Sequence, residues 1–461
     1  MRRHLSGEEL RSVFGLAAPI ALLQTGLVLQ GTVATVFAGR FGAQAIATVG
    51  LAGSTYFMFF IAAWGVLLGI DPLSARAFGA GRRDECAEVL VHALVVGLLA
   101  ALPVFAALSA SGRFLAWIGV APGLAATVAA YLRILRWGLF PGLLFTACRQ
   151  YLQTLSITWP QLAAVLAADA VAAVLDYGLM FGHFGLPAMG VAGAAWAMLA
   201  AYGVMLAVAA AAAAWQVRGS GWRWSGLKPA LLWELVRLGV PATGQMIAES
   251  GAFSLTSLLC GRMGAVASAA HQIVLNLAGL SFMVPLGISH AAAVRVGQGL
   301  GHHRPDRAAR SGWAALAIGA AFMSLTCLAY LFLPRRILGF YTTDPAVLAL
   351  GARLLMVAGV FQVFDAAQVV MTGALRGLGE TRVPMLANAV GYWAVGLPVG
   401  VCLAFAGGWG AFGLWIGLCL GLCSVAVFLL LVWRRRSAAL WSGETAPEPA
   451  APAADRAPEA I

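Results

Sequence analysis

The sequence predicts an all-α membrane protein in which twelve transmembrane helices form two parallel six-helix repeats, an N-lobe and a C-lobe, around a central cavity. Composition is the first observation: 61% of the 461 residues are hydrophobic and only 10% are charged, against about 45–50% and 25% in soluble domains. The second is that the apolar residues come in runs of about twenty, long enough to cross a hydrocarbon core as helices. The alternating pattern of a membrane β-barrel is absent. The third is an internal repeat.

Twelve apolar runs can be placed along the chain, each of them separated from the next by a short polar or glycine-containing segment. The expected spans are 12–38, 46–70, 87–109, 128–152, 159–181, 189–216, 231–260, 266–294, 308–333, 346–375, 384–406 and 410–433.

The repeat is clearest where GRMGAVASA (261–269) matches GRFGAQAIA (39–47) at six of nine positions, 222 residues apart. The same offset separates Pro241 from Pro19. Each half contains six spans, an even number, so both halves enter the membrane from the same side. This predicts parallel repeats with a substrate path between them near the middle of the membrane.

The repeat also predicts the domain boundaries. Residues 1–216 form the N-lobe and residues 231–433 form the C-lobe, with 217–230 as a cytoplasmic linker. Residues 434–461 are rich in Pro and Ala, and we expect them to be a disordered cytoplasmic tail.

Basic residues predict the orientation. If the N-terminus is cytoplasmic, nineteen basic residues fall in inside segments and five fall outside. Both termini are then cytoplasmic. The outside residues are Arg40, Arg113, Arg262, Arg335 and Arg336. The net charge of +11 does not indicate nucleic-acid binding, because the arginines lie in short loops between apolar runs and not on one basic face.

Five acids lie within or at the edge of the predicted spans: Asp71, Asp169, Asp176, Glu249 and Asp365. An ionised carboxylate at that depth costs about 2.5–3.5 kcal/mol on insertion scales, so such residues are candidates for binding a cation or a proton. The alternative is a structural hydrogen bond between helices. Asp71 opens a segment with a proline behind it, and we expect it to pair with charges at the cytoplasmic surface.

Asp365 lies on a polar stripe. Thr372 and Arg376 follow it by seven and eleven residues on the same helix face, and Gln362 and Gln368 flank it by one turn. A stripe of this kind cannot face lipid.

Glu249 lies on span 231–260 with Gln245 one turn before it. Carboxylates on two spans of the same half, Glu249 and Asp365, can share one monovalent cation or one proton. Span 266–294 carries a further polar group, consisting of His271, Gln272 and Asn276.

Several segments, in this order, resemble the multidrug and toxic compound extrusion (MATE) family and are closest to its bacterial branch: ATVFAGRFGA, GIDPLSARAFGAG, VPATGQMIAE, AAHQIVLN, RVGQGLG and FQVFDAAQVVMTGALRG. The likeness covers about residues 10–432. It implies twelve helices in two lobes and export of organic cations driven by inward flow of sodium ions or protons. The family's C-lobe acids fall on Glu249 and Asp365, where Na⁺ would bind, and we expect no other cofactor. A tyrosine usual one turn before the second acid is Phe361 here.

The N-lobe departs from the family pattern. Related transporters carry an aspartate on the first span at the position of Ala34, which binds neither cation nor proton. Asp176 on the fifth span stands where an asparagine is frequent, and Asp169 lies two turns earlier on the same face. Either the N-lobe carboxylate has moved from span 1 to span 5, or the lobe has lost its ion site.

The alternatives to cation-coupled export are a lipid flippase and a membrane-embedded enzyme. A flippase for lipid-linked precursors shares the broad architecture but needs a basic central cavity, whereas the deep charges here are mostly acidic. An enzyme needs a metal cluster or a nucleophile with its base, and the sequence has neither. We therefore expect a monomeric, multi-pass protein of the bacterial inner (plasma) membrane that binds organic small molecules and no nucleic acid.

Overall fold

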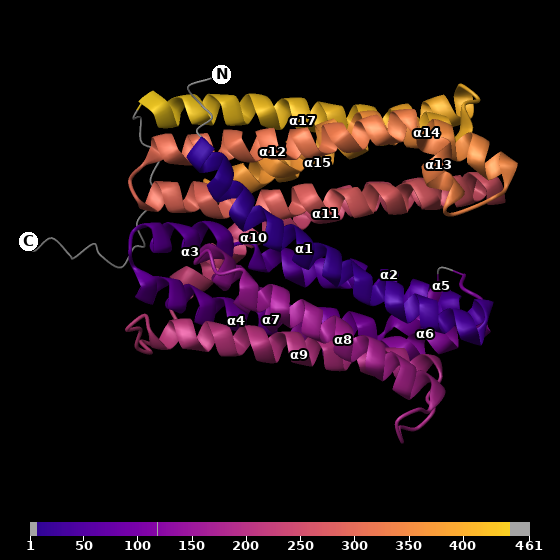
Figure 1. Cartoon of the computed structure of the whole chain (residues 1–461), viewed down its shortest axis with the longest axis horizontal. Coiled ribbons are helices and arrows are strands. Elements are labelled where there is room, and N and C mark those ends of the chain that lie inside the picture. The colour runs from indigo at the N-terminus through magenta and orange to yellow at the C-terminus, as the bar shows by residue number, and fades with distance from the viewer. Residues whose placement is uncertain (1–6, 118, 443–461) are drawn as a thin grey trace, which may run out of the picture.

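The computed structural model describes residues 7–117 and 119–442, which are nearly all helical (Figure 1). The helices are α1 (Gly7–Ala38), α2 (Ala43–Leu67), α3 (Ile70–Gly79), α4 (Arg83–Ser109), α5 (Ser111–Trp117), α6 (Pro122–Leu135), α7 (Leu139–Thr154), α8 (Trp159–Phe181), α9 (Val191–Arg218), α10 (Pro229–Arg262), α11 (Ala265–Gly301), α12 (Pro305–Phe332), α13 (Pro334–Gly339), α14 (Pro345–Gly377), α15 (Arg382–Asn388), α16 (Leu397–Val401) and α17 (Gly410–Ser442). Within the described residues, eleven helical stretches are long and apolar enough to cross a membrane. The predicted helical membrane fold is confirmed.

The remaining predicted span, 231–260, forms α10, which is not among those eleven. It has 34 residues, and at 1.5 Å per residue it is about 50 Å long, more than the thickness of a hydrocarbon core. Its lower apolarity comes from Glu234, Arg237, Gln245 and Glu249. Because of these side chains, α10 is the most polar of the long helices that correspond to predicted spans.

Figure 1 shows two layers of helices, with α2, α4 and α7–α9 in one lobe and α11–α17 in the other. The first helix of each repeat connects them. The first half of α1, including Val13 and Ile20, packs in a core of C-lobe residues, whereas Leu23 and Ala34 pack in the N-lobe core. Conversely, α10 places Leu235 in the N-lobe core and its later residues in a C-lobe core. The two repeats therefore exchange contacts through their first helices.

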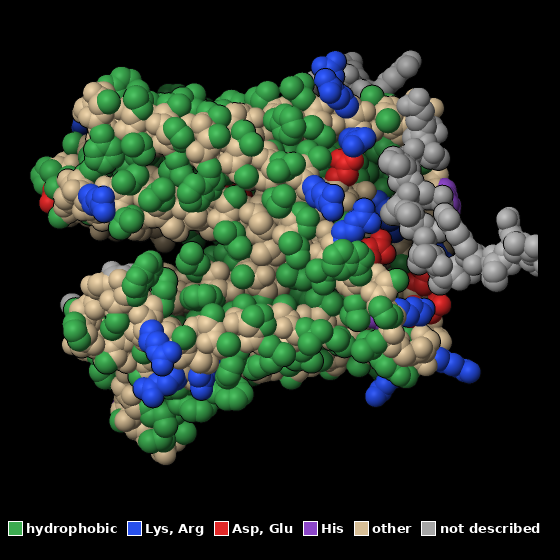
Figure 2. All heavy atoms as spheres, turned by 180° about the vertical axis from the view of Figure 1, so that it is seen from behind, with side chains coloured by type: hydrophobic (Ala, Val, Ile, Leu, Met, Phe, Trp, Pro, Cys, Tyr) green, Lys and Arg blue, Asp and Glu red, His purple; other side chains and the backbone are tan. Residues whose placement is uncertain are grey.

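The lobes are closed against each other at the end where α1 begins. The closest helix contacts there require glycine, which has no side chain. A Cβ atom on Gly239 of α10 would lie 1.9 Å from the Val66 carbonyl oxygen of α2, and one on Gly301 of α11 would lie 2.1 Å from the Arg76 carbonyl oxygen of α3. Only glycine allows helices to approach this closely. At the other end, near α5, α6 and α13, the lobes separate, and Figure 2 shows the cleft between them.

The structure also shows where the helices end at the predicted linker and at the predicted tail. The segment between α9 and α10, residues 219–228, matches the predicted linker. Helix α17 continues to Ser442, so residues 434–442 are helical and the prediction of disorder there is wrong. An apolar helix can continue through the basic residues that follow it, because Arg and Ala are good helix formers. The remaining tail, residues 443–461, lies outside the described residues.

Candidate functional site

The two C-lobe acids lie on facing helices, Glu249 on α10 and Asp365 on α14, and their carboxyl groups are close enough to interact electrostatically. Gln368 connects them to a third helix. Its amide nitrogen donates to Glu249 Oε2 at 3.3 Å and to Asn388 Oδ1 of α15 at 3.1 Å. Asp365 is buried, and Gln245 lies within reach of the Glu249 carboxyl. Two carboxyl groups in this setting attract a small cation or a proton.

Tyr392 was missed by the sequence reasoning. It lies in the irregular helical turn Ala389–Gly396, is fully buried, and interacts electrostatically with both Glu249 and Asp365. Its hydroxyl has no hydrogen-bond partner among the described residues. Position 361, where the resemblance implies a tyrosine, holds Phe361, whose ring packs on Trp415. The hydroxyl near the acids thus comes from a different helix, and the only signal for it was a tyrosine one turn after Asn388.

The polar stripe on α14 is partly as predicted. Thr372 and Arg376 line a narrow pocket together with Gln245 of α10. Gln362 is fully buried, next to the Tyr330 hydroxyl. Thr372 and Gln245 therefore meet in one pocket between α10 and α14, and Asp365 lies two turns before Thr372 on α14.

The polar group on α11 does not form one site. His271 is buried inside the C-lobe, where Trp415 Nε1 donates to its Nδ1 at 3.1 Å and Ser257 Oγ lies 2.7 Å from its Nε2. Gln272 is exposed, and Asn276 accepts a hydrogen bond from Tyr341 at 3.1 Å. Residues one and five positions apart point to different sides of a helix, which explains the separation.

Asp71 is completely buried, so its predicted place at the cytoplasmic surface is wrong. The chain does not form a loop at Pro72; it continues as α3, with Asp71 in the first turn, where proline is tolerated. Its Oδ2 lies 3.6 Å from Arg376 Nε of α14 and 3.8 Å from His290 Nδ1 of α11. Arg376 therefore pairs with an acid of the other lobe and not with Asp365.

A further buried arginine completes this group. Arg149 of α7 donates to Gln24 of α1 at 2.6 Å and interacts electrostatically with Asp71. We call Gln24, Asp71, Arg149, His290 and Arg376 the interlobe cluster. Its members come from both lobes, and all of them are buried.

The N-lobe acids lie on α8, which packs along α1. Asp169 is within reach of Gln30, and Phe37 contacts Tyr177 with ring centres 6.3 Å apart. This register places Ala34, between Gln30 and Phe37, opposite the segment of α8 between Asp169 and Tyr177, which includes Asp176. Both Ala34 and Asp176 are 2% exposed.

Asp176 also has a neighbour on a third helix. It interacts electrostatically with Tyr131 of α6. One of its carboxylate oxygens has no hydrogen-bond partner within the described residues. The N-lobe therefore contains a buried, incompletely satisfied carboxyl on the helix that packs along α1.

The chain matches the MatE family model over residues 19–178 and 241–402, one match in each lobe. It is 39% identical to multidrug resistance protein NorM of Burkholderia vietnamiensis, covering 91% of this chain and 92% of that protein. It is 36% identical to the probable multidrug resistance protein NorM of Mesorhizobium japonicum, over 93% and 94% of the two chains. The crystal structure of the eukaryotic MATE transporter AtDTX14 has the same fold, with a TM-score of 0.84, 20% identity and coverage of 95% of this chain and 99% of that one. Two family matches in the expected halves, together with relatives above 30% identity along nearly the whole chain, show that this protein belongs to the MatE family, the multidrug and toxic compound extrusion transporters.

Proposed function

We propose that this protein exports organic cations in exchange for inward-moving sodium ions or protons, by alternating access between its two lobes. The observation that carries the proposal is the pair of carboxyl groups on α10 and α14, Glu249 and Asp365, next to the unpartnered Tyr392 hydroxyl. The relatives named multidrug resistance protein NorM support a role in drug export, and the preference for cations rests on the acid pair.

The acid pair supplies a physical reason for exchange. An inorganic cation or proton on Glu249 and Asp365 cancels the negative charge that attracts an organic cation into the cleft. Binding of one therefore weakens binding of the other, and this negative coupling is reciprocal. Entry of the driving ion then releases the drug, which is the step an antiporter requires.

The closed end of the molecule supports alternating access. Hydrogen bonds join the lobes there: Arg76 donates to the Leu378 carbonyl, and Gln298 donates to the Thr154 carbonyl at 2.8 Å. These contacts must break for the cleft to open on that side.

The excess of basic residues in the segments at the closed end supports a cytoplasmic location for that end. Both termini are then cytoplasmic, in a bacterial inner (plasma) membrane, and the cleft faces outward. No part of this transport cycle requires a second copy of the chain, so the working unit is a monomer.

Transport in proteoliposomes tests the proposal. The purified protein would be reconstituted, a fluorescent organic cation loaded, and its movement followed under an imposed sodium gradient, an imposed proton gradient or neither. Faster cation export under one of the gradients identifies the driving ion. No acceleration by either gradient would contradict ion-coupled export.

A lipid flippase is the alternative function, and the interlobe cluster is the observation that favours it, because Arg149 and Arg376 are buried cations between the lobes. Asp71 lies beside both, and the cluster is located at the closed end, so the acid pair accounts better for the cleft. The same proteoliposomes distinguish the functions: translocation of a labelled phosphate-bearing lipid without drug export would favour the flippase.

Orientation has its own test. Cysteines introduced at Ser220, His303 and Arg335 would be labelled from outside intact cells with an impermeant reagent. Labelling only at position 335 is expected, whereas labelling at 220 or 303 would reverse the topology.

A further inference from the structure

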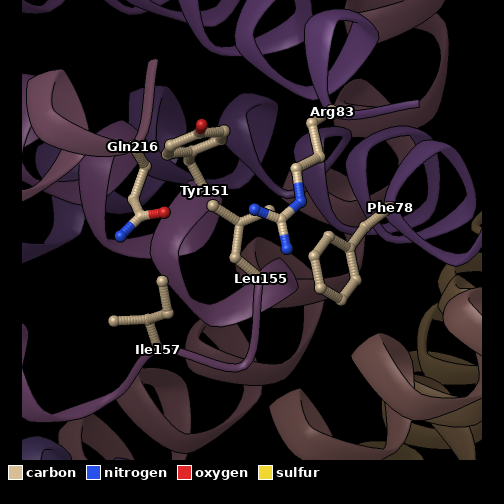
Figure 3. A pocket seen from close by; sticks show the side chains of 6 residues that line it. All are labelled: Phe78, Arg83, Tyr151, Leu155, Ile157 and Gln216. Atoms are coloured by element: carbon tan, nitrogen blue, oxygen red, sulfur yellow. The ribbon is translucent and has the colours of Figure 1, made fainter. Parts of the chain in front are cut away.

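A separate cavity lies in the N-lobe, at the closed end of the molecule and away from the cleft. Its volume is about 220 Å³. The lining residues are Phe78, Arg83, Tyr151, Leu155, Ile157 and Gln216 (Figure 3). They come from the places where α3, α7 and α9 end and α4 begins. Because helix ends meet there, the cavity opens at the level of the membrane surface and not into the drug path.

The cavity offers hydrogen-bond donors that have no partner. Arg83 is exposed, its guanidinium lies 5.9 Å from the centre of the Phe78 ring, and no carboxylate in the described part of the chain forms an ion pair with it. Tyr151 is 1% exposed, and its hydroxyl forms no hydrogen bond to any described residue. Gln216 adds a half-buried amide. All three side chains line the same cavity (Figure 3).

Asp84, next to Arg83 in the sequence, is exposed and forms no ion pair with it among the described residues, and the next two acids along α4 are held by other cations. Glu85 pairs with Arg82 at 2.7 Å, and Glu88 pairs with Lys228 of the linker at 2.6 Å. Arg83 is therefore left to attract an external anion. A site with a free guanidinium, a free phenol and an amide favours phosphate oxygens, which accept several hydrogen bonds at once.

Exposed tryptophans lie at the end of α9 and in the linker that follows it. The linker backbone N–H at Lys228 donates to His92 Nε2 of α4 at 2.8 Å, which fixes the linker against the helix that carries Arg83. Trp215 and Trp224 are 74% and 60% exposed, on either side of Arg218 and Arg223. Exposed tryptophans mixed with basic residues are typical of the headgroup layer of an anionic leaflet, and Figure 2 shows Lys and Arg side chains at this end of the molecule.

We propose that this cavity binds the phosphate-bearing headgroup of an anionic phospholipid from the adjoining leaflet. Arg83, Tyr151 and Gln216 donate to the phosphate, and Leu155 and Ile157 contact the glycerol backbone and the start of the acyl chains. A volume of 220 Å³ is several times the roughly 30 Å³ of a water molecule in the liquid, which is enough for a phosphate group. The proposal depends on the membrane fold and not on which ion drives transport.

The site is also connected to the closed state. Gln298 of α11 donates to the Thr154 carbonyl at 2.8 Å and to Ser156 Oγ at 3.0 Å, and these residues form the turn that carries Leu155 and Ile157. Opening of this end breaks the contact and releases one wall of the cavity. Headgroup binding therefore favours the conformation in which this end is closed.

Native mass spectrometry of the full-length protein in detergent tests the proposal. The protein is titrated with phosphatidylglycerol or with phosphatidylcholine of the same acyl chains. The wild type is expected to bind one phosphatidylglycerol more tightly than phosphatidylcholine. Removing one cation, in Arg83→Gln, should weaken phosphatidylglycerol binding about fivefold, with a smaller loss for Tyr151→Phe.

Two controls keep the result interpretable. Arg83→Lys retains the charge and should keep most of the affinity, which separates loss of the cation from misfolding. Arg262→Gln removes an exposed arginine from the opposite end and should leave binding unchanged. Equal affinity for both lipids, or unchanged binding by Arg83→Gln, would overturn the proposal. Displacement of bound phosphatidylglycerol by inorganic phosphate would assign the site to a soluble anion, and this result would also overturn the proposal of a lipid ligand.

Discussion

Asp71 Oδ2 lies 3.6 Å from Arg376 Nε, and this ion pair joins α3 of the N-lobe to α14 of the C-lobe with both side chains buried. The two residues are 305 positions apart. Arg376 is on the same helix as Asp365, three turns away. A change at the ion site can therefore reach the contact between the lobes through one rigid helix.

Neutralising one partner of this pair should destabilise the closed end. In Asp71→Asn the buried arginines lose their nearest acid, at a cost of about 3–5 kcal/mol for breaking a buried pair. Cysteines near the Gln298–Thr154 contact should then become accessible from the cytoplasm, as measured by labelling. The matched control is Asp306→Asn, since Asp306 pairs with Arg310 at the surface and such pairs contribute about 0–1 kcal/mol. Partial restoration by the swap Asp71→Arg with Arg376→Asp would support the pair; equal accessibility of wild type and Asp71→Asn would contradict it.

Neutralising either C-lobe acid should abolish gradient-driven export. Glu249→Gln and Asp365→Asn keep the size of each side chain, so the fold should persist while the negative charge that binds the driving ion is lost. Proteoliposome transport measures the effect, with thermal unfolding as the check on folding. Asp344→Asn serves as control, because Asp344 caps the start of α14 by accepting from the backbone N–H groups of Ala346 and Val347. The assignment fails if both Glu249→Gln and Asp365→Asn transport at the wild-type rate.

Removing the Tyr392 hydroxyl should weaken ion binding without abolishing transport. A hydrogen bond to a charged group contributes about 1.5–3 kcal/mol, so Tyr392→Phe should raise the ion concentration for half-maximal export about 10- to 100-fold. Tyr330→Phe is the control, because the Tyr330 hydroxyl donates to the Leu277 carbonyl within the C-lobe. An unchanged ion dependence in Tyr392→Phe would show that its hydroxyl does not contact the ion.

The N-lobe offers a test between relocation and loss of its carboxylate. If Asp176 has replaced the acid missing at Ala34, Asp176→Asn should lower export or drug binding, and Ala34→Asp in that background should restore part of it, since the two positions lie on helices that pack against each other. Drug binding by fluorescence quenching and export by proteoliposome assay measure the two effects. Full activity of Asp176→Asn leaves only the interpretation that this lobe has lost its ion site.

The C-lobe site shows which kinds of information a sequence carries. Glu249, Asp365, Gln245 and Thr372 were predicted because each lies on a regular helix face, where spacing fixes direction. Tyr392 was not predicted, because it lies in a helical turn of irregular spacing, and its partners are on α10 and α14. Asp71 was misplaced for a related reason: a proline and nearby arginines suggested a surface loop, and only the packing of α11 and α14 against α3 buries it.

The sequence by itself determined the helical membrane fold, the two repeats and the helices that carry the deep acids. These properties follow from local composition and periodicity, because an apolar run of sufficient length must form a helix in lipid to satisfy its backbone. The tertiary structure alone decided that α1 and α10 each connect both lobe cores, that Arg376 pairs with Asp71, and that the cleft opens near α5, α6 and α13. These depend on contacts between residues hundreds of positions apart, and the closest of them require glycine where two backbones meet. Such contacts leave no periodic pattern in either segment, so only the packed structure reveals them.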